Sequence, residues 1–368
     1  MDFRLDSLHD DLAQTVAAIT TRSGGVTVAR AWADGDRAPG LAAYRALAEA
    51  GITGLLVDDA LGGSGAGAVE MVVAVEQLGR ACLPGPVAET FAVVPALLSD
   101  ARLDDELLPL VRGERLATCA APPRQPRAAD PDDSAVYLVT DGGLFRGRAG
   151  TPLPTVDPTR CVAVVEPATS MVEPVEPARA RPCRNHLDLG ALATAAQSLG
   201  LASAMLEIAA EYAKARHQFG RAIGEFQAVK HHLADVAIAV EMARPLIWGA
   251  AVTGDRLDVS AAKVAASDAA DLAARRSLQV LGAIGYTAEH DLSLYLTKAR
   301  ALRSAWGTPA WHRQRILEDL STSSRGEETR SRGEETRARS EASSRGETTS
   351  RSDTSSRSEA SARSTGHG

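Results

Sequence analysis

Apolar residues recur at helical spacing along most of the 368-residue chain. The pattern is strongest between positions 187 and 320, where polar residues take the intervening positions. Two apolar stripes stand out there: Leu201, Met205, Ile208 and Tyr212 form the first, and Phe226, Val229, Leu233, Val236 and Val240 form the second. A third stretch covers 257–281, and a shorter pair follows between 286 and 316. Long helices joined by short links predict an antiparallel four-helix bundle, in which Pro245 would kink or end the second helix.

The segment from 6 to 98 is also predicted to be helical, with short breaks. Gly51 directly follows one apolar stripe, as expected for a residue that ends a helix. A glycine cluster at 62–65 follows the apolar residues 55–57. Because no Lys-Ser/Thr follows and the spacing is not Gly-x-Gly-x-x-Gly, this cluster predicts a turn before a helix and not a phosphate-binding loop.

The pattern changes between 116 and 186, where short β-branched runs are bounded by proline and glycine. Residues 135–139 and 161–165 are candidate strands, and Asp141-Gly142-Gly143 lies between them. This insert is too short for a core of its own. The prediction is therefore a mainly α protein with a small β domain: an N-terminal α-helical domain (1–115), a reduced middle β domain (116–186), a C-terminal helical bundle (187–320) and a tail (321–368).

The tail contains no Val, Ile, Leu or aromatic residue from Ser321 onward. Ser-Arg-Gly-Glu-Glu-Thr occurs at 324–329 and again at 331–336, with a near copy at 344–349. A segment of this composition has no apolar surface to bury, so we expect it to be disordered.

Composition narrows the choice of partners. The net charge of -7 argues against nucleic acid, which requires a clustered basic face. The four cysteines form no Cys-x-x-Cys pair and have no histidine at ligand spacing, which predicts reduced thiols and no metal site. The N-terminus has no apolar signal core, and no uninterrupted apolar stretch reaches membrane-spanning length. We therefore expect a cytoplasmic protein that does not contact a membrane.

The segment 216–227 joins the first two helices of the bundle and is the main candidate for ligand binding. It begins with Arg216 and contains the amides of Gln218 and Gln227 as well as Gly220. A fork-shaped cation beside a helix terminus suits a phosphate or diphosphate. The alternative is a solvated turn between two helices, which would be the favoured interpretation of this motif by itself.

Five groups of motifs in a fixed order resemble the acyl-CoA dehydrogenase family over nearly the whole chain except the tail. They are Gly54-Leu55-Leu56-Val57 with Gly62-Gly63; Glu76-Gln77-Leu78-Gly79-Arg80; Leu-Gly-Leu-Ala-Ser-Ala (199–204) before Ala-Arg-His-Gln-Phe-Gly (215–220); Phe226-Gln227 with Leu233-Ala234-Asp235; and Gln279 to Tyr286 before Gly307-Thr308. The resemblance implies an FAD flavoprotein that dehydrogenates an acyl-CoA thioester between Cα and Cβ. It also implies a homologous neighbouring subunit, in a homo- or hetero-tetramer, and an external electron acceptor.

The same resemblance assigns cofactor-binding roles to particular positions. The residues that would approach the FAD of a neighbouring subunit are Arg216, Gln218, Phe219 and Gly220. Those that would approach the adenine and diphosphate are Gln279, Gly282 and Ala283, and Thr308 would lie near the flavin. Glycines in these segments are consistent with backbone N–H groups that approach a diphosphate.

The sequence departs from the family at its catalytic base. The family's glutamate before Gly-Thr is replaced by Trp306, and an indole cannot accept a proton. The earlier helix position that some members use is Gly190, and the adjacent substrate-contacting arginine is replaced by Ala191. Ala283 replaces the second glycine of the family's Gln-x-Leu-Gly-Gly motif. Residues 118–123 replace the family's Thr-Glu-Pro-x-Ala-Gly-Ser-Asp stretch, which helps to hold the flavin and the acyl chain. The catalytic base is thus left unassigned.

Other proton acceptors are weak candidates. Glu289 and His290 lie near the Gly-x-Gly-Tyr segment, where the family has an acidic residue for structural reasons. His312 is interpreted as a surface histidine, and the adjacent His231 and His232 as surface or interface residues that cannot share one metal.

Three hypotheses follow, in order of preference. The first is a subunit that acts with a homologous partner supplying the base, as in some actinobacterial members, several of which act on steroid side-chain thioesters. The second is a self-sufficient dehydrogenase with a displaced base. The third is a catalytically degenerate protein of the same fold that serves as a binding or scaffold protein.

Overall fold

The computed structural model describes residues 5–140, 143–172 and 181–321, without the side chains of 181–185. The chain divides into two compact units, Met1–Arg313 and Gln314–Gly368. In the second unit the described residues, 314–321, are helical. The predicted disordered tail after residue 321 lies outside the described residues.

The N-terminal part of the first unit is helical, as predicted. Its helices are α1 (Ser7–Arg22), α2 (Val26–Ala33), α3 (Ala38–Glu49), α4 (Ala68–Arg80), α5 (Val94–Asp100) and α6 (Asp104–Val111). A π-helical turn, Glu89–Val93, precedes α5. Gly51 follows α3 in the left-handed region at φ 80°, which confirms its predicted role as a helix-ending residue.

The middle part contains a four-stranded sheet in the order β1-β3-β4-β7. Its strands are β1 (Leu116–Ala120), β3 (Ser134–Thr140), β4 (Gly143–Ala149) and β7 (Val165–Val172). β1 and β3 pair in parallel, and the other pairs are antiparallel. A small three-stranded sheet is formed by β2 (Ala128–Ala129), β6 (Cys161–Ala163) and β5 (Leu153–Pro154).

The sheet depends on the helices for its core, as its short length predicted. Leu116, Cys119, Tyr137 and Leu144 belong to the same buried cluster as the helical core. On the other face only a small separate cluster is buried, which includes Val136 and Leu138. The sheet is therefore stabilised mainly by packing against helices.

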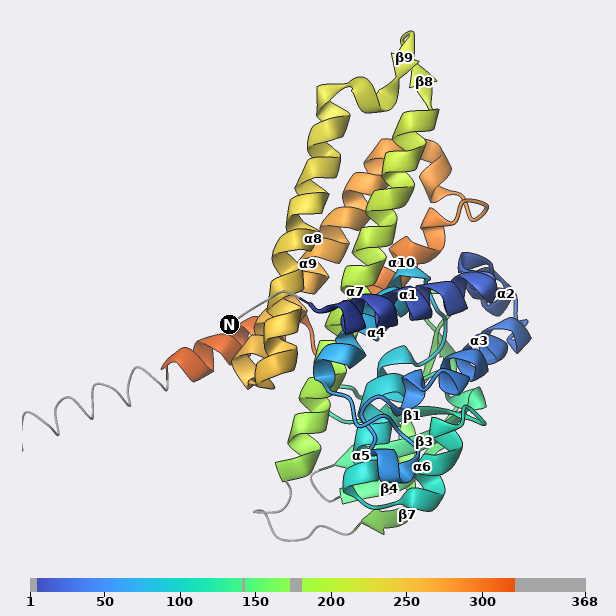
Figure 1. Cartoon of the computed structure of the whole chain (residues 1–368), viewed down its shortest axis with the longest axis vertical. Coiled ribbons are helices and arrows are strands. Elements are labelled where there is room, and N and C mark those ends of the chain that lie inside the picture. Colours follow the sequence, from blue (N-terminus) through green and yellow to red (C-terminus); the bar gives the residue numbers. More distant parts are fainter. Residues whose placement is uncertain (1–4, 141–142, 173–180, 322–368) are drawn as a thin grey trace, which may run out of the picture. The chain divides into compact units, whose positions relative to one another are not determined.

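The bundle consists of α7 (Arg181–Ala215), α8 (Gln227–Thr253), α9 (Arg256–Leu281) and α10 (Leu292–Leu302), which run in alternating directions (Figure 1). α7 begins six residues before the predicted start at 187. Of the two predicted effects of Pro245, a kink or an end of the helix, the end is wrong, because α8 continues to Thr253. A proline removes one backbone hydrogen bond, but α8 packs on α7 and α9, and this packing outweighs the local loss.

Close packing of α4 on α7 explains two of the glycines in the family motifs. A Cβ on Gly79 would lie under 3.0 Å from the carbonyl oxygen of Gln197. A Cβ on Gly200 would lie equally close to the carbonyl oxygen of Glu76. The two helices therefore cross with backbone against backbone, a distance that only glycine permits.

Two bundle helices are long and apolar enough to cross a membrane by length and composition, namely His186–Ala215 of α7 and all of α8. Polar residues interrupt both helices, so the expectation that no uninterrupted apolar stretch reaches membrane-spanning length is not contradicted. The most apolar window of α7 is 89% buried within the protein, as expected for a core helix, whereas that of α8 is only 28% buried. α8 thus presents an apolar face that the described part of the chain does not cover.

Candidate cofactor and substrate site

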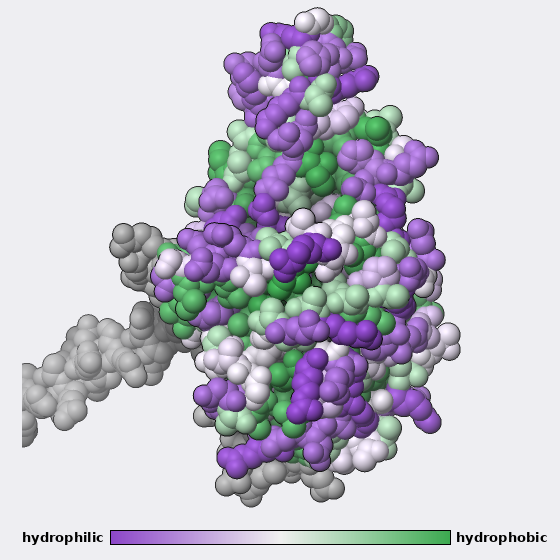
Figure 2. Space-filling view, turned by 45° about the vertical axis from the view of Figure 1, so that its right-hand side comes forward, coloured by the Kyte–Doolittle hydropathy of each residue, from purple (hydrophilic) through white to green (hydrophobic). Residues whose placement is uncertain are grey.

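The predicted cofactor loop is a β-hairpin at the end of the bundle. Strands β8 (His217–Gln218) and β9 (Arg221–Ala222) project beyond the ends of α7 and α8 (Figure 1). Arg216, Gln218, Phe219 and Gly220 are all exposed there, and Phe219 is 92% exposed. Figure 2 shows mainly hydrophilic surface at this end. The structure therefore brings this predicted set together on a solvent-facing tip.

The tip has the features that a diphosphate requires. Within the described residues, the guanidinium of Arg216 makes no hydrogen bond or ion pair with this chain. Gly220 has φ 79°, and a Cβ placed on it would meet nothing within 4 Å. A free forked cation beside an open backbone fits a diphosphate held against a second molecule.

The second predicted set lies toward the same end of the bundle. α9 ends at Leu281, and the 3-10 turn Gly282–Tyr286 follows it (Figure 1). Gln279, Gly282 and Ala283 are exposed, and a Cβ on Gly282 would also meet nothing within 4 Å. The methyl group of Ala283 therefore crowds nothing in this chain, and this set is also compatible with FAD bound between subunits.

Thr308 does not join these residues, because it follows Trp306 at the other end of α7. Gly190 of α7 packs against the indole of Trp306, and α7 continues from there to Ala215. At a rise of 1.5 Å per residue, these 25 residues span about 38 Å. The predicted cofactor residues therefore form two separate regions at opposite ends of the bundle.

Trp306, at the position that the resemblance assigned to the family's glutamate, is a core residue. It is 1% exposed, and a Cβ on Gly190 would lie under 3.0 Å from its ring. The two positions that the resemblance assigned to the family's base, 306 and 190, thus lie in contact, with the indole of Trp306 against Gly190.

Two residues that the sequence did not predict hold this indole and its backbone. Trp306 Nε1 donates to Glu89 Oε1 at 3.0 Å, and the backbone N–H of Trp306 donates to Gln125 Oε1 at 3.1 Å. Glu89 is the single charged residue between Arg80 and Asp100, which was an available signal. It belongs to the π-helical turn Glu89–Val93, a distortion that often occurs at functional sites.

The backbone at this site is fixed from the other side by His312. Its Nε2 lies 3.1 Å from the carbonyl oxygen of Trp306, and its Nδ1 lies 3.2 Å from Ser260 Oγ. The prediction of a surface histidine is wrong, since His312 is fully buried. The carbonyl must accept, so Nε2 carries the proton and Nδ1 can accept from the serine hydroxyl. His312 is a structural residue that positions the Trp306–Gly307 turn.

The remaining candidate bases do not reach Trp306. Glu289 is exposed, and its backbone carbonyl accepts from Arg30. His290 Nδ1 accepts from the backbone N–H of Leu292, where α10 begins. The 11 residues of α10 cover about 16 Å before the chain approaches Trp306. Neither residue can act as a base at the Trp306 position.

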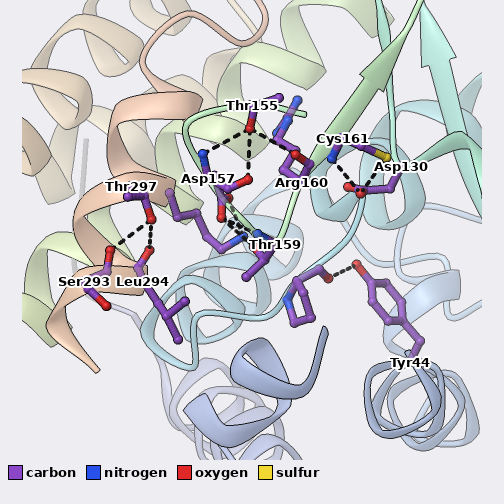
Figure 3. A network of polar contacts seen from close by, with 12 residues as sticks. Tyr44, Asp130, Thr155, Asp157, Thr159, Arg160, Cys161, Ser293, Leu294 and Thr297 are labelled. Carbon is purple, nitrogen blue, oxygen red and sulfur yellow. Dashed lines mark hydrogen bonds and ion pairs between the residues drawn. The ribbon is translucent and has the colours of Figure 1, made fainter. Parts of the chain in front are cut away.

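A separate buried network connects α10 to the small sheet (Figure 3). Lys298 Nζ lies 3.0 Å from Asp157 Oδ2 and donates to Thr159 Oγ1 at 2.6 Å. Burial alone would raise the pKa of Asp157, but Lys298 and the hydrogen bonds from Thr159 hold it below its usual range. Asp130, nearby, accepts from the backbone N–H of Cys161 at 3.1 Å, and burial raises the pKa of Asp130 to about 6. This network stabilises the junction of bundle and sheet and contacts none of the predicted site residues.

Cys82, Cys119 and Cys161 are free thiols, as predicted for them. In the described ranges no group of three or more His, Cys, Asp or Glu residues could hold a metal ion.

Comparison with known proteins gives the same assignment as the fold and the motifs. Residues 7–101 match the acyl-CoA dehydrogenase N-terminal domain, and residues 182–321 match the acyl-CoA dehydrogenase C-terminal domain. Acyl-CoA dehydrogenase IpdE2 of Mycobacterium tuberculosis is 34% identical over 292 residues, covering 78% of this chain and 89% of that protein.

Two solved structures show the same architecture. The ChsE4-ChsE5 complex from Mycobacterium tuberculosis has a TM-score of 0.74 at 25% identity and covers 87% of this chain and 99% of that chain. Butyryl-CoA dehydrogenase from Megasphaera elsdenii has a TM-score of 0.76 at 21% identity and covers 87% of this chain and all of its own.

The fold and the matched domains thus define a flavoprotein-type oxidoreductase acting on the CH–CH group of an acyl-CoA. The chain belongs to the acyl-CoA dehydrogenase family. The predicted family, fold class, reaction class and FAD as the family's cofactor are confirmed.

Proposed function

We propose that this chain is one subunit of a cytoplasmic, hetero-oligomeric, FAD-dependent acyl-CoA dehydrogenase. A homologous partner subunit supplies the carboxylate that removes the α-proton of the thioester. This chain supplies the hairpin tip and the end of α9 as part of the cofactor-binding surface. FAD, when bound, provides the acceptor for the hydride that leaves Cβ.

The observation that carries the proposal is the buried indole of Trp306 at the base position. An indole N–H donates and does not accept. The carboxylate of Glu89 accepts that N–H at 3.0 Å and is buried at this place. Glu89 is therefore not free to remove a proton there, which supports a base supplied by a second chain.

The separation of the two cofactor regions supports an assembly of several chains. Arg216 and Gly220 project at one end of α7, and Thr308 lies near the other, about 38 Å away along the helix. A single FAD cannot contact both regions of one chain. The tip of this chain would therefore serve an FAD whose flavin lies in a neighbouring subunit.

The uncovered face of α8 offers a surface for that neighbour. Ile238, Met242 and Leu246 are spaced four residues apart and are 63%, 67% and 44% exposed. Glu241 and Arg244 on the same helix argue against lipid as the covering partner. An apolar helical stripe bordered by charges is typical of a contact between protein helices.

The proposal can be tested by purifying this chain alone and together with a co-expressed homologous dehydrogenase chain. We expect flavin absorbance, and its bleaching by acyl-CoA, only in the co-purified complex. Steroid-derived acyl-CoAs are the first substrates to test, as the resemblance to actinobacterial members suggests. Flavin and bleaching in the isolated chain would exclude the dependence on a partner.

A scaffold protein is the alternative function, and the closed Trp306 site is the observation that favours it. A scaffold would remain colourless under both conditions. A dehydrogenase subunit would instead co-purify with its partner and with flavin.

The role of the hairpin has its own test. Arg216→Ala removes the only guanidinium proposed to contact the diphosphate, so FAD retention by the complex should fall by about tenfold or more. Lys214→Ala is the control, because Lys214 is an exposed cation two residues earlier that pairs with Glu211. Equal FAD retention in both variants would remove Arg216 from the site.

A further inference from the structure

Glu89 is a buried carboxylate in an apolar part of the chain, and it faces the indole of Trp306. Its relative exposure is 1%, and its described hydrogen bond is the one from Trp306 Nε1 at 3.0 Å. Burial of a carboxylate is costly, and one neutral N–H compensates for only part of that cost. A glutamine at position 89 could accept the same hydrogen bond without a charge. The hydrogen bond alone therefore does not account for an acid at this position.

Glu89 faces the place that the resemblance assigned to the family's catalytic base. The indole ring lies against Gly190, so it occupies the space between the two family base positions and Glu89. A reacting atom placed where Nε1 now lies would be about 3 Å from Glu89 Oε1, which is the distance at which a general base works. The carboxylate thus points at the place where the family removes a proton, with the indole in between.

Several contacts hold the backbone that carries the indole, and the ring itself is held by its hydrogen bond to Glu89. The backbone N–H of Trp306 donates to Gln125, and its carbonyl accepts from His312. Its φ of 56° is a left-handed conformation, and the next residue, Gly307, also has a positive φ of 100°. These contacts hold the backbone in one conformation and keep the ring over Glu89.

We propose that Glu89 is a masked proton acceptor for an acyl-CoA thioester, and that Trp306 is the plug that masks it. The inference rests on the proposed function, because it takes the Trp306 position to be the acyl site. In the unplugged site the Cα–H bond breaks, its proton passes to Glu89 Oε1, and its electron pair remains on the thioester as an enolate. Return of a solvent deuteron to Cα completes an exchange that requires no oxidant.

The plug can be removed by Trp306→Gly in the chain co-purified with its partner. Binding of butyryl-CoA is measured by equilibrium dialysis, and exchange of its α-hydrogens with D2O by mass spectrometry. We expect one additional thioester bound per Trp306→Gly chain, together with α-exchange at that new site. In Trp306→Gly/Glu89→Gln the additional binding should remain and the added exchange should fall by about 100-fold, the typical contribution of a general base.

Two further variants make the result specific to the carboxylate. Trp306→Phe keeps most of the ring and is expected to give neither additional binding nor exchange. Trp306→Gly/Glu89→Asp should recover part of the exchange, since the acid is retained at a greater distance. If circular dichroism shows that Trp306→Gly is unfolded, Trp306→Leu replaces it, because leucine retains part of the core volume.

The outcomes separate this inference from the proposed function. α-Exchange needs neither hydride transfer nor flavin reduction, so it can be observed even if the complex contains no flavin. A folded Trp306→Gly or Trp306→Leu variant without additional thioester binding would show that Trp306 does not block a thioester site. Additional binding with exchange that is unchanged by Glu89→Gln would overturn Glu89 as the acceptor.

Discussion

At the scale of residues, the contact between Trp306 and Glu89 joins positions 217 apart in the sequence. The resemblance to the family assigned the usual base to position 306 and the alternative base to position 190. The meeting of these two positions, and the presence of Glu89 and Gln125 beside them, depend on tertiary packing that a local pattern does not contain. The prediction of His312 as a surface residue failed for the same reason. The local sequence does not show that another element covers this histidine, which is fully buried.

Trp306 should be a large contributor to stability. Trp306→Ala removes a buried ring and leaves Glu89 without its donor, so it should lower the free energy of unfolding by about 3–5 kcal/mol. Urea denaturation followed by circular dichroism measures this change. Trp311→Ala is the matched control at a partly exposed tryptophan, where we expect about 1 kcal/mol. Similar losses in the two variants would contradict a specific role for the Trp306 contacts.

Asp130 should make stability depend on pH. Burial raises its pKa from 3.8 to about 6, so the folded state favours the protonated acid. The stabilisation is complete below about pH 4 and is lost as the pH rises through 6, with a size on the order of 1–3 kcal/mol. Asp130→Asn keeps an acceptor for the N–H of Cys161 and should remove this part of the pH dependence. Urea midpoints at pH 4.5 and 7.5 measure the effect, and an unchanged difference between them would exclude Asp130 as its origin.

At the scale of elements, periodicity predicted the bundle helices and one strand of the main sheet. Residues 161–165, predicted as one strand, are divided between β6 and the first residue of β7, and β1 and β4 were not predicted. The long bundle helices were predicted from apolar stripes, and residues 135–139 lie within β3 as expected. Pro245 does not end α8, because its local cost is outweighed by packing of α8 on α7 and α9. The small strands β2 and β5 have two residues each, too few to produce a detectable alternation.

The crossing of α4 and α7 should tolerate no side chain at Gly200. Gly200→Ala would place a methyl group against the backbone of Glu76 and should cost about 2 kcal/mol or more, since neither helix can move away easily. Gly150→Ala is the control, because its Cβ would meet only an ordinary contact at 3.5 Å. Thermal unfolding of both variants measures the difference. A Gly200→Ala melting temperature equal to that of the control would mean that the helices can separate at little cost.

At the scale of the whole molecule, an exposed apolar stripe on α8 accompanies the hairpin β8–β9, which projects from the same bundle and is proposed to bind the cofactor. Family resemblance predicted a neighbouring subunit, but only the structure shows that this stripe is uncovered by the described residues. Burial cannot be derived from periodicity alone, because both faces of α8 carry apolar residues, one toward α9 and one outward.

Met242→Glu should weaken subunit association. It places a charge at the centre of the α8 stripe, between Ile238 and Leu246, and burying it would cost several kcal/mol. Sedimentation velocity of the co-purified complex should show an increased fraction of dissociated chains. Leu8→Glu changes another apolar residue that is 66% exposed, on α1, and should leave association unchanged. Equal behaviour of the two variants would place the subunit contact elsewhere.

The distance of about 38 Å along α7 between the hairpin and the tryptophan has a consequence for mixed assemblies. Under the proposed function, a substitution in the hairpin lowers FAD retention in an adjoining subunit, whereas a substitution near Trp306 destabilises the chain that carries it. In a mixed assembly the first kind of defect should therefore appear in the flavin content of the partner, and the second in the stability of this chain.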